Sequence, residues 1–126
     1  MKLPIALSLL FLIAALGWTA CGDDTPNWLD QANCTGIDAV ANTYNLNVKA
    51  VLDATCALSG CHDAGTASKG INLSTYAGAK AAFEDGDALC AINHGDGCAP
   101  MPNGGIKLPD ATINLLACWA KNGYKQ

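Results

Sequence analysis

The heptapeptide Cys56-Ala57-Leu58-Ser59-Gly60-Cys61-His62 places two thiols and an imidazole within one short stretch of the chain. Two thiols beside an imidazole can form a disulfide loop, contribute to a metal site, or attach a prosthetic group. The residues before the heptapeptide predict a helix over roughly 43–55, because their apolar side chains recur at helical spacing. These side chains are Val40, Tyr44, Val48, Val51 and Leu52. The chemistry-bearing side chains are therefore expected to follow directly on the end of a helix.

The rest of the sequence predicts short helices joined by long loops, with no strand pattern. The expected elements are a helix from Ser74, as its N-cap, to Gly86, a short helix over 87–93, a loop over 95–105, and a last helix over 110–121 that stops at Asn122-Gly123. The predicted fold class is all-α. Such a chain has few apolar side chains for a core, which indicates that something else helps to fill it.

The first twenty residues are expected to be a signal peptide of the lipoprotein type. Met1-Lys2 supplies the positive charge, and Leu3 to Leu16 is an apolar run too short to span a bilayer comfortably. The stretch Gly17-Trp18-Thr19-Ala20-Cys21 resembles a bacterial lipobox, which implies lipidation of Cys21 and a chain anchored to a membrane. Tryptophan stands where the lipobox normally has leucine, so cleavage by ordinary signal peptidase after the glycine is the alternative.

Composition indicates an exported protein. Eleven acidic residues against seven basic ones give a net charge of −4, which excludes a strongly basic nucleic-acid surface. Seven cysteines and thirteen glycines in so short a chain are typical of a loop-rich domain in an oxidising compartment. We expect residues 1–20 to be removed, residues 21–36 to be a tether, and residues 37–126 to form one domain in the periplasm or on the outer surface.

A second motif, Ala99-Pro100-Met101-Pro102-Asn103-Gly104-Gly105, follows later in the chain. A methionine in a proline-stiffened loop has little core to fill, and its soft thioether is a ligand that suits ferrous iron. Met101 is therefore the candidate for the second axial ligand of a metal ion bound by His62. His94 is the competing ligand, although its Gly/Asp-rich turn favours a solvated side chain.

The heptapeptide has two other interpretations. Cys56 and Cys61 can be a disulfide staple beside a surface histidine, which is the default for neighbouring cysteines in an exported protein. A zinc site is the other metal hypothesis, but adjacent Cys61 and His62 would reach one tetrahedral centre with difficulty. Its ligands would be Cys56, Cys61 and His62 with either His94 or Cys98.

From Tyr44 to Gly123, the order of helix, Cys/His motif, helix, Met-Pro loop and terminal helix resembles the single-haem class I cytochrome c family. The most similar stretches are Leu73-Ser74-Thr75-Tyr76-Ala77-Gly78-Ala79-Lys80, Met101-Pro102-Asn103-Gly104-Gly105 and Cys118-Trp119-Ala120-Lys121-Asn122-Gly123. They look like the haem c domains common in exported Bacteroidetes lipoproteins. One departure is the spacing of the cysteines, with four residues between them where the family usually has two.

This resemblance implies a cytochrome c domain over 37–126, with short helices wrapped around one covalent haem c. Cys56 and Cys61 would attach the haem, and His62 and Met101 would bind the iron. The implied function is electron transfer between redox partner proteins, not catalysis, because both axial positions are filled. A haem peroxidase would need an open sixth position. The alternative function is a disulfide-braced extracellular binding or structural domain without haem.

Four further cysteines, Cys34, Cys90, Cys98 and Cys118, allow three pairings in an oxidising compartment. We favour Cys90 with Cys98, because this short loop would hold the segment before Met101. We favour Cys34 with Cys118 because the two ends of the domain meet in the family fold that the chain resembles.

Five apolar residues are expected in the core whichever function applies, and three acidic residues are expected to form a solvated helix end. The core residues are Leu73, Phe83, Ile106, Leu108 and Trp119, and the acidic residues are Glu84, Asp85 and Asp87.

Overall fold

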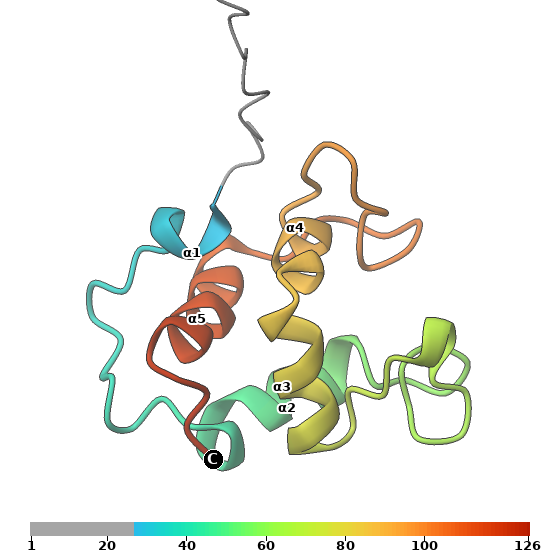
Figure 1. The fold of residues 1–126 in the computed structure, drawn as a ribbon, viewed down its shortest axis with the longest axis horizontal. Coiled ribbons are helices and arrows are strands. Elements are labelled where there is room, and N and C mark those ends of the chain that lie inside the picture. The colour runs from blue at the N-terminus through green and yellow to red at the C-terminus, as the bar shows by residue number, and fades with distance from the viewer. Residues whose placement is uncertain (1–26) are drawn as a thin grey trace, which may run out of the picture.

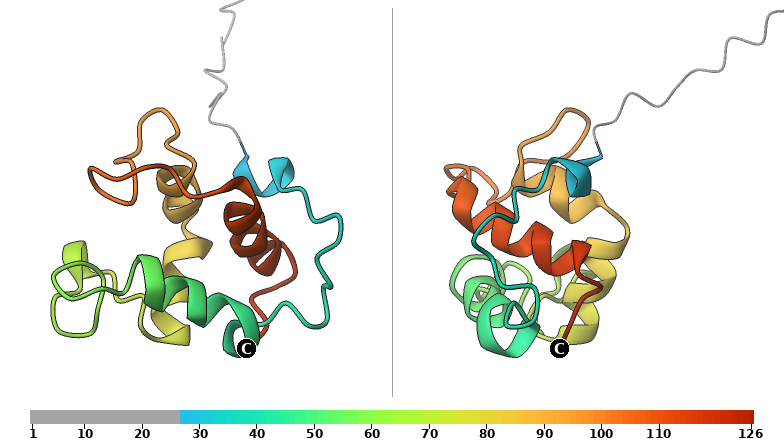
Figure 2. Two further views of the ribbon diagram at one scale, coloured as in Figure 1. Left: turned by 180° about the vertical axis from the view of Figure 1, so that it is seen from behind. Right: turned by 90° about the vertical axis from the view of Figure 1, so that its left-hand side faces the viewer.

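The computed structural model describes residues 27–126. The predicted signal peptide over 1–20 and the predicted lipidation of Cys21 lie outside these residues. Figure 1 shows a helical molecule with long loops on both sides: the loop after α1 runs along one side, and the loops before α3 and before α5 extend on the other. Figure 2 shows the same arrangement from two further directions.

The described residues contain helices and no strand, so the prediction of an all-α chain is confirmed. In chain order the elements are α1 (Trp28–Gln31), the π-helical turn η1 (Tyr44–Val48), α2 (Lys49–Thr55), the 3-10 turn η2 (Ser68–Gly70), α3 (Tyr76–Glu84), α4 (Asp87–Ile92) and α5 (Asp110–Lys121).

The helix predicted over 43–55 is present as η1 and α2, which follow each other without a break. The Thr43 side chain caps this helix by accepting a hydrogen bond from the backbone N–H of Leu46. Val48 and Leu52 are fully buried on one face. Because the helix ends at Thr55, the heptapeptide begins directly after it.

Helix α3 begins one residue later than predicted. Thr75 is the N-cap and accepts from the N–H of Gly78, whereas the Ser74 hydroxyl donates to the side-chain oxygen of Asn72 at 2.6 Å. The Ser74 hydroxyl, which was expected to cap the helix, is thus hydrogen-bonded to the Asn72 side chain instead. Gly78 is required for packing, since a Cβ there would lie 1.9 Å from the carbonyl oxygen of Asn72. Gly86, with φ of +82°, then separates α3 from α4.

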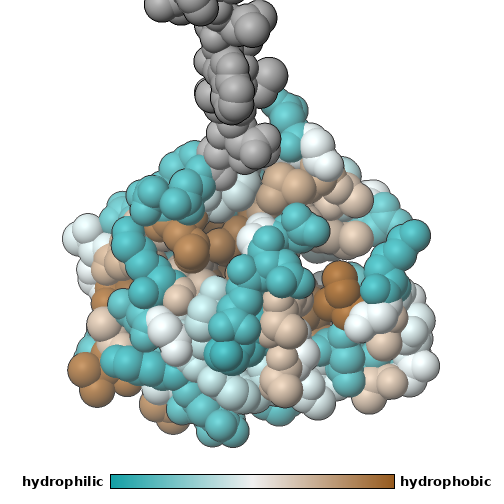
Figure 3. All heavy atoms as spheres, viewed as in Figure 1, coloured by the Kyte–Doolittle hydropathy of each residue, from teal (hydrophilic) through white to brown (hydrophobic). Residues whose placement is uncertain are grey.

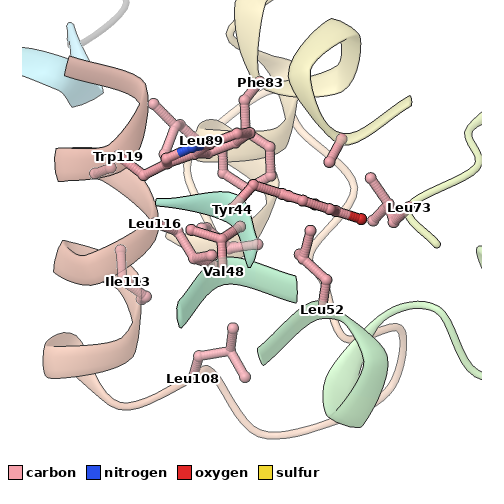
Figure 4. Packing of buried hydrophobic residues seen from close by; sticks show 13 residues of the cluster. Tyr44, Val48, Leu52, Leu73, Phe83, Leu89, Leu108, Ile113, Leu116 and Trp119 are labelled. Atoms are coloured by element: carbon pink, nitrogen blue, oxygen red, sulfur yellow. The ribbon is translucent and has the colours of Figure 1, made fainter. Parts of the chain in front are cut away.

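Helix α5 is the centre of the core, and Figure 4 shows its apolar side chains facing η1 and α2. Trp119 is fully buried, and its indole N–H donates to the carbonyl of Lys125 at 2.7 Å. The core prediction is confirmed for four of its five members: Leu73, Phe83, Leu108 and Trp119. The prediction is wrong for Ile106, because 92% of its surface is exposed in a loop that turns at Gly104-Gly105.

Two disulfides brace the helices in the pairing that the sequence analysis favoured. Cys34 is bonded to Cys118 and Cys90 to Cys98, with Cα atoms 5.7 and 6.0 Å apart. The first bond fastens α1 and the residues after it to α5, where Asn33 also donates its N–H to the side chain of Asn114. The described part of the predicted tether, 27–36, is therefore held against the helices.

Candidate functional site

The loop after α2 is closed by backbone hydrogen bonds around the Cys/His motif. Cys56 donates its N–H to the carbonyl of Leu52 at 2.8 Å, and His62 donates to the carbonyl of Cys56 at 3.1 Å. The carbonyl of His62 then accepts from the N–H of Leu73 at 2.8 Å. The four residues between the cysteines form a turn in which Gly60 has φ of +83°. The wider spacing is thus accommodated as a bulge, while both ends of the motif are fixed to buried leucines.

The two thiols of the motif differ in their surroundings. Cys56 is half-buried and packs against the hydrophobic core, whereas Cys61 is exposed. Burial raises the pKa of the Cys56 thiol, although the Thr55 hydroxyl 3.2 Å from the sulfur opposes this effect. Neither thiol is in a disulfide, while the other four cysteines within 27–126 are paired. The disulfide interpretation of the motif is therefore not realised in this structure.

This arrangement predicts the order in which the thiols react. In protein with both thiols free and without reduction, iodoacetamide should label Cys61 before Cys56, because Cys61 is exposed whereas Cys56 is half-buried and burial raises its pKa. The four paired cysteines should stay unlabelled. Peptide mapping by mass spectrometry checks this, and a peptide linking Cys56 to Cys61 would contradict it.

His62 presents one ring nitrogen for coordination. Its Nδ1 lies 3.1 Å from the carbonyl oxygen of Ile71. Because a carbonyl oxygen only accepts, Nδ1 carries a proton, and in the neutral ring Nε2 then has the lone pair. Metal-binding histidines are commonly oriented in this way by a carbonyl on the other nitrogen. The loop between His62 and Leu73 therefore supplies both the candidate ligand and the carbonyl that orients its ring.

Met101 is half-buried and packs against the core from the second loop. Its N–H donates to the carbonyl of Ala91 at 3.0 Å, and its own carbonyl accepts from Nε2 of His94 at 3.0 Å. The Cys90 to Cys98 disulfide closes the chain just before it. His94 is half-buried, and its ring is hydrogen-bonded to the Met101 backbone. This corrects the expectation that the His94 side chain is solvated.

Figures 1 and 2 place the Cys/His loop and the Met101 loop on the same side of the molecule. Figure 3 shows a hollow on this side, with apolar atoms between polar ones. Cys56 and Met101 are both partly buried side chains that pack against the hydrophobic core.

The zinc hypothesis receives no support from the described residues. Cys98, one of its candidate ligands, is bonded to Cys90. Between residues 27 and 126 there is no group of three or more His, Cys, Asp or Glu side chains that could hold a metal ion.

Tyr44 carries a buried polar group at a position that sequence reasoning treated only as apolar. Its ring is buried in the core, and its hydroxyl has no hydrogen-bond partner among the described residues. The only signal in the sequence was a tyrosine at a position that periodicity assigned to the core. Whether its hydroxyl would find a partner depends on packing, which periodicity does not report.

A separate hollow of 220 Å³ lies between α1, α5 and Asn93, the residue that follows α4. Most of its lining is polar, and none of it belongs to either motif. The lining residues are Trp28, Gln31, Ala32, Asn33, Asn93, Asp110, Ile113, Asn114 and Ala117.

No known protein family, curated protein or solved structure matches this chain. None of the helices between residues 27 and 126 is long and apolar enough to cross a bilayer.

Proposed function

We propose that the chain is an exported single-haem c-type cytochrome that passes electrons between redox partner proteins. Cys56 and Cys61 hold the haem through thioether bonds, and His62 and Met101 bind its iron. One observation carries the proposal. In a framework where four cysteines are oxidised, the two described cysteines that remain unpaired are those beside His62.

The donor set fits a haem c. Two unpaired thiols are available for the thioether bonds, and His62 keeps a free ring nitrogen while Ile71 orients the ring. Met101 adds a soft ligand whose backbone is fixed on both sides. When bound, the haem supplies the one-electron chemistry, and the chain holds it, orients it and excludes water from it.

The surroundings of these ligands support an electron carrier over an enzyme. Met101 and Cys56 pack on a buried apolar cluster, which gives the proposed group a dry environment. An iron with two protein ligands has no open position for oxygen or peroxide. A peroxidase-like activity would require that Met101 leave the iron.

An oxidising location is supported by the two disulfides, which persist outside the cytoplasm. We include in the proposal that a lipid on Cys21 anchors the protein to a bacterial membrane. Mass analysis of the N-terminal peptide tests this part separately from the haem.

Covalent haem content tests the proposed function. The full chain is produced in a bacterial host with and without the haem c maturation system, and the mass of the denatured protein is measured. We expect the mass of one haem to be added only with the maturation system, and to survive acid-acetone extraction. Complete loss of haem in that extraction would contradict the proposal.

A disulfide-braced binding domain without haem is the second candidate. It is favoured by the polar hollow beside α1 and α5, whose lining includes Asn33 and Ala117, the chain neighbours of the bonded Cys34 and Cys118. It predicts no haem on the protein from either host.

Replacing Met101 by alanine should remove the weak red absorption band of sulfur-ligated ferric iron and lower the midpoint potential. The thioether stabilises ferrous iron and blocks access to the metal, so the variant should also gain reactivity with peroxide. Absorption spectra and potentiometry check this.

His94→Ala is the matched control, since the His94 ring donates a hydrogen bond to the Met101 carbonyl but is not an iron ligand in this proposal. It should weaken the red band while leaving sulfur on the iron. A wild type without the red band, whose low-spin spectrum changes in His94→Ala but not in Met101→Ala, would transfer the ligand role to His94.

A further inference from the structure

The hollow of 220 Å³ between α1, α5 and Asn93, the α1–α5 hollow, contains polar side chains that the proposed haem site does not use. Figure 1 shows α1 lying against α5, with α4 beside them. The lining residues from α5 follow the spacing i, i+3, i+4 and i+7 and therefore share one face of that helix: Asp110, Ile113, Asn114 and Ala117.

Three asparagine amides that line the hollow are each held at one end by the backbone. The side-chain oxygen of Asn33 accepts from the N–H of Thr35 at 3.1 Å, and that of Asn114 accepts from the N–H of Asn33 at 3.0 Å. The Nδ2 of Asn93 donates to the carbonyl of Leu89 at 2.8 Å. Because an N–H only donates and a carbonyl only accepts, these partners also fix which way round each amide lies.

The other end of each amide has no hydrogen-bond partner among the described residues. Asn33 and Asn114 thus offer two NH₂ donors, and Asn93 offers an oxygen acceptor. The exposed carboxylate of Asp110 adds a second acceptor to the same lining. An amide that is already fixed at one end loses little conformational freedom when its other end binds, so these groups are preorganised for a ligand.

An apolar surface lies beside these polar groups. Ile113 and Ala117 are buried, and the half-buried Trp28 contributes to the lining from α1. The indole is packed closely against the chain, since a Cβ on Gly95 would lie 2.5 Å from the Cζ2 of Trp28 and 3.0 Å from the Cys90 sulfur. The aromatic wall of the hollow is therefore held in place by the segment that the Cys90 to Cys98 disulfide closes.

The chemistry of the lining disfavours charged ligands. No lysine, arginine or histidine is among the described lining residues, so the hollow has no cation to balance a phosphate or a carboxylate. A divalent cation needs several oxygen ligands, but backbone N–H groups occupy the side-chain oxygens of Asn33 and Asn114. A neutral ligand that both donates and accepts hydrogen bonds fits these groups better.

We propose that the α1–α5 hollow binds one neutral pyranose unit, either as a free hexose or as the end of a glycan chain. A pyranose has an apolar C–H face that suits the Trp28 ring, and a rim of hydroxyl groups that each donate and accept. Sites for drug-sized ligands have volumes of about 300–1,000 Å³, so a hollow of 220 Å³ suits a single ring. This inference does not rest on the proposed haem.

The test titrates the purified, isotope-labelled protein with glucose, galactose, mannose and N-acetylglucosamine, and then with oligosaccharides of the sugar that binds. Proton–nitrogen NMR spectra should show saturable shifts of the Trp28 indole N–H and of the Asn33 and Asn114 side-chain amides, in the millimolar range of sugar. The Trp119 indole N–H should not move, because it is buried and bonded to the carbonyl of Lys125.

Three variants connect this binding to the amides. Asn114→Asp removes the NH₂ donor but keeps the oxygen that accepts from Asn33, and its affinity for the sugar should fall about tenfold. Asn33→Asp should act in the same way, because its remaining oxygen still accepts from Thr35. Asn45→Asp is the matched control, since it makes the same charge change at an exposed residue outside the lining and should leave the affinity unchanged.

The absence of a saturable shift with all four sugars would overturn the inference, as would equal losses of affinity in Asn114→Asp and Asn45→Asp. Shifts of the same signals with inorganic phosphate or calcium, but not with sugar, would also overturn it. Tighter binding of an oligosaccharide than of its monosaccharide identifies a glycan chain as the ligand, and equal affinities identify a free hexose. Covalent haem is measured separately by mass, so failure of sugar binding is distinct from failure of the proposed function.

Discussion

Replacing both Cys56 and Cys61 by alanine is expected to remove all covalently bound haem from the protein. These are the two described cysteines left unpaired, so the variant leaves the two disulfides intact. Each single substitution should leave one thioether, and the haem should then keep one vinyl group. The mass of the denatured protein and the absorption maximum of its pyridine haemochrome measure this.

The matched control is the removal of the Cys90 to Cys98 pair, which should leave the haem bound through two thioethers. A second comparison is His62→Ala, which should keep covalent haem but lose the low-spin spectrum, because the ring that Ile71 orients is gone. Haem retained by the protein without Cys56 and Cys61 would contradict the proposed attachment.

Secondary structure was predictable wherever periodicity and stop signals agreed. The helix expected over 110–121 has those bounds in the structure, because its apolar face repeats every turn and Asn122-Gly123 ends it. The N-cap of α3 was misplaced because Ser74 and Thr75 are both good caps. The choice between them was made by Asn72, whose side chain binds the Ser74 hydroxyl.

The loops were harder to predict because long-range contacts decide them. Ile106 is apolar, but the glycine turn before it directs its side chain into solvent. His94 looked solvated from its polar neighbours, yet a contact with the carbonyl of Met101 half-buries it. Sequence composition reports neither effect.

Part of the candidate site could be predicted from the sequence and part could not. Cys56, Cys61, His62 and Met101 were identified from residue type and spacing, since few other side chains combine those donors. The contact by which the Ile71 carbonyl orients His62 and the lack of a partner for the Tyr44 hydroxyl depend on how the chain packs in three dimensions. Contacts of this kind, which surround the candidate ligands, have no local pattern in the sequence.

Removing the Cys34 to Cys118 disulfide should have the largest effect on stability. This bond closes a loop with a sequence separation of 84 residues, and the chain-entropy model assigns it about 4.5 kcal/mol. The Cys90 to Cys98 bond, with a separation of 8, is worth about 2.5 kcal/mol by the same model. Native domains are stable by about 5–15 kcal/mol, so losing the longer loop removes a large share of the total.

The two disulfides should also differ in which property they control. The longer loop ties α1 to α5, away from the proposed ligands, so Cys34→Ala with Cys118→Ala should lower the free energy of unfolding and leave the midpoint potential unchanged. The shorter loop closes just before Met101, so Cys90→Ala with Cys98→Ala should lose less stability but weaken the red iron–sulfur band. Denaturant titration and potentiometry of both holoproteins measure this, and equal losses of stability would show that loop length does not set the contribution of these bonds.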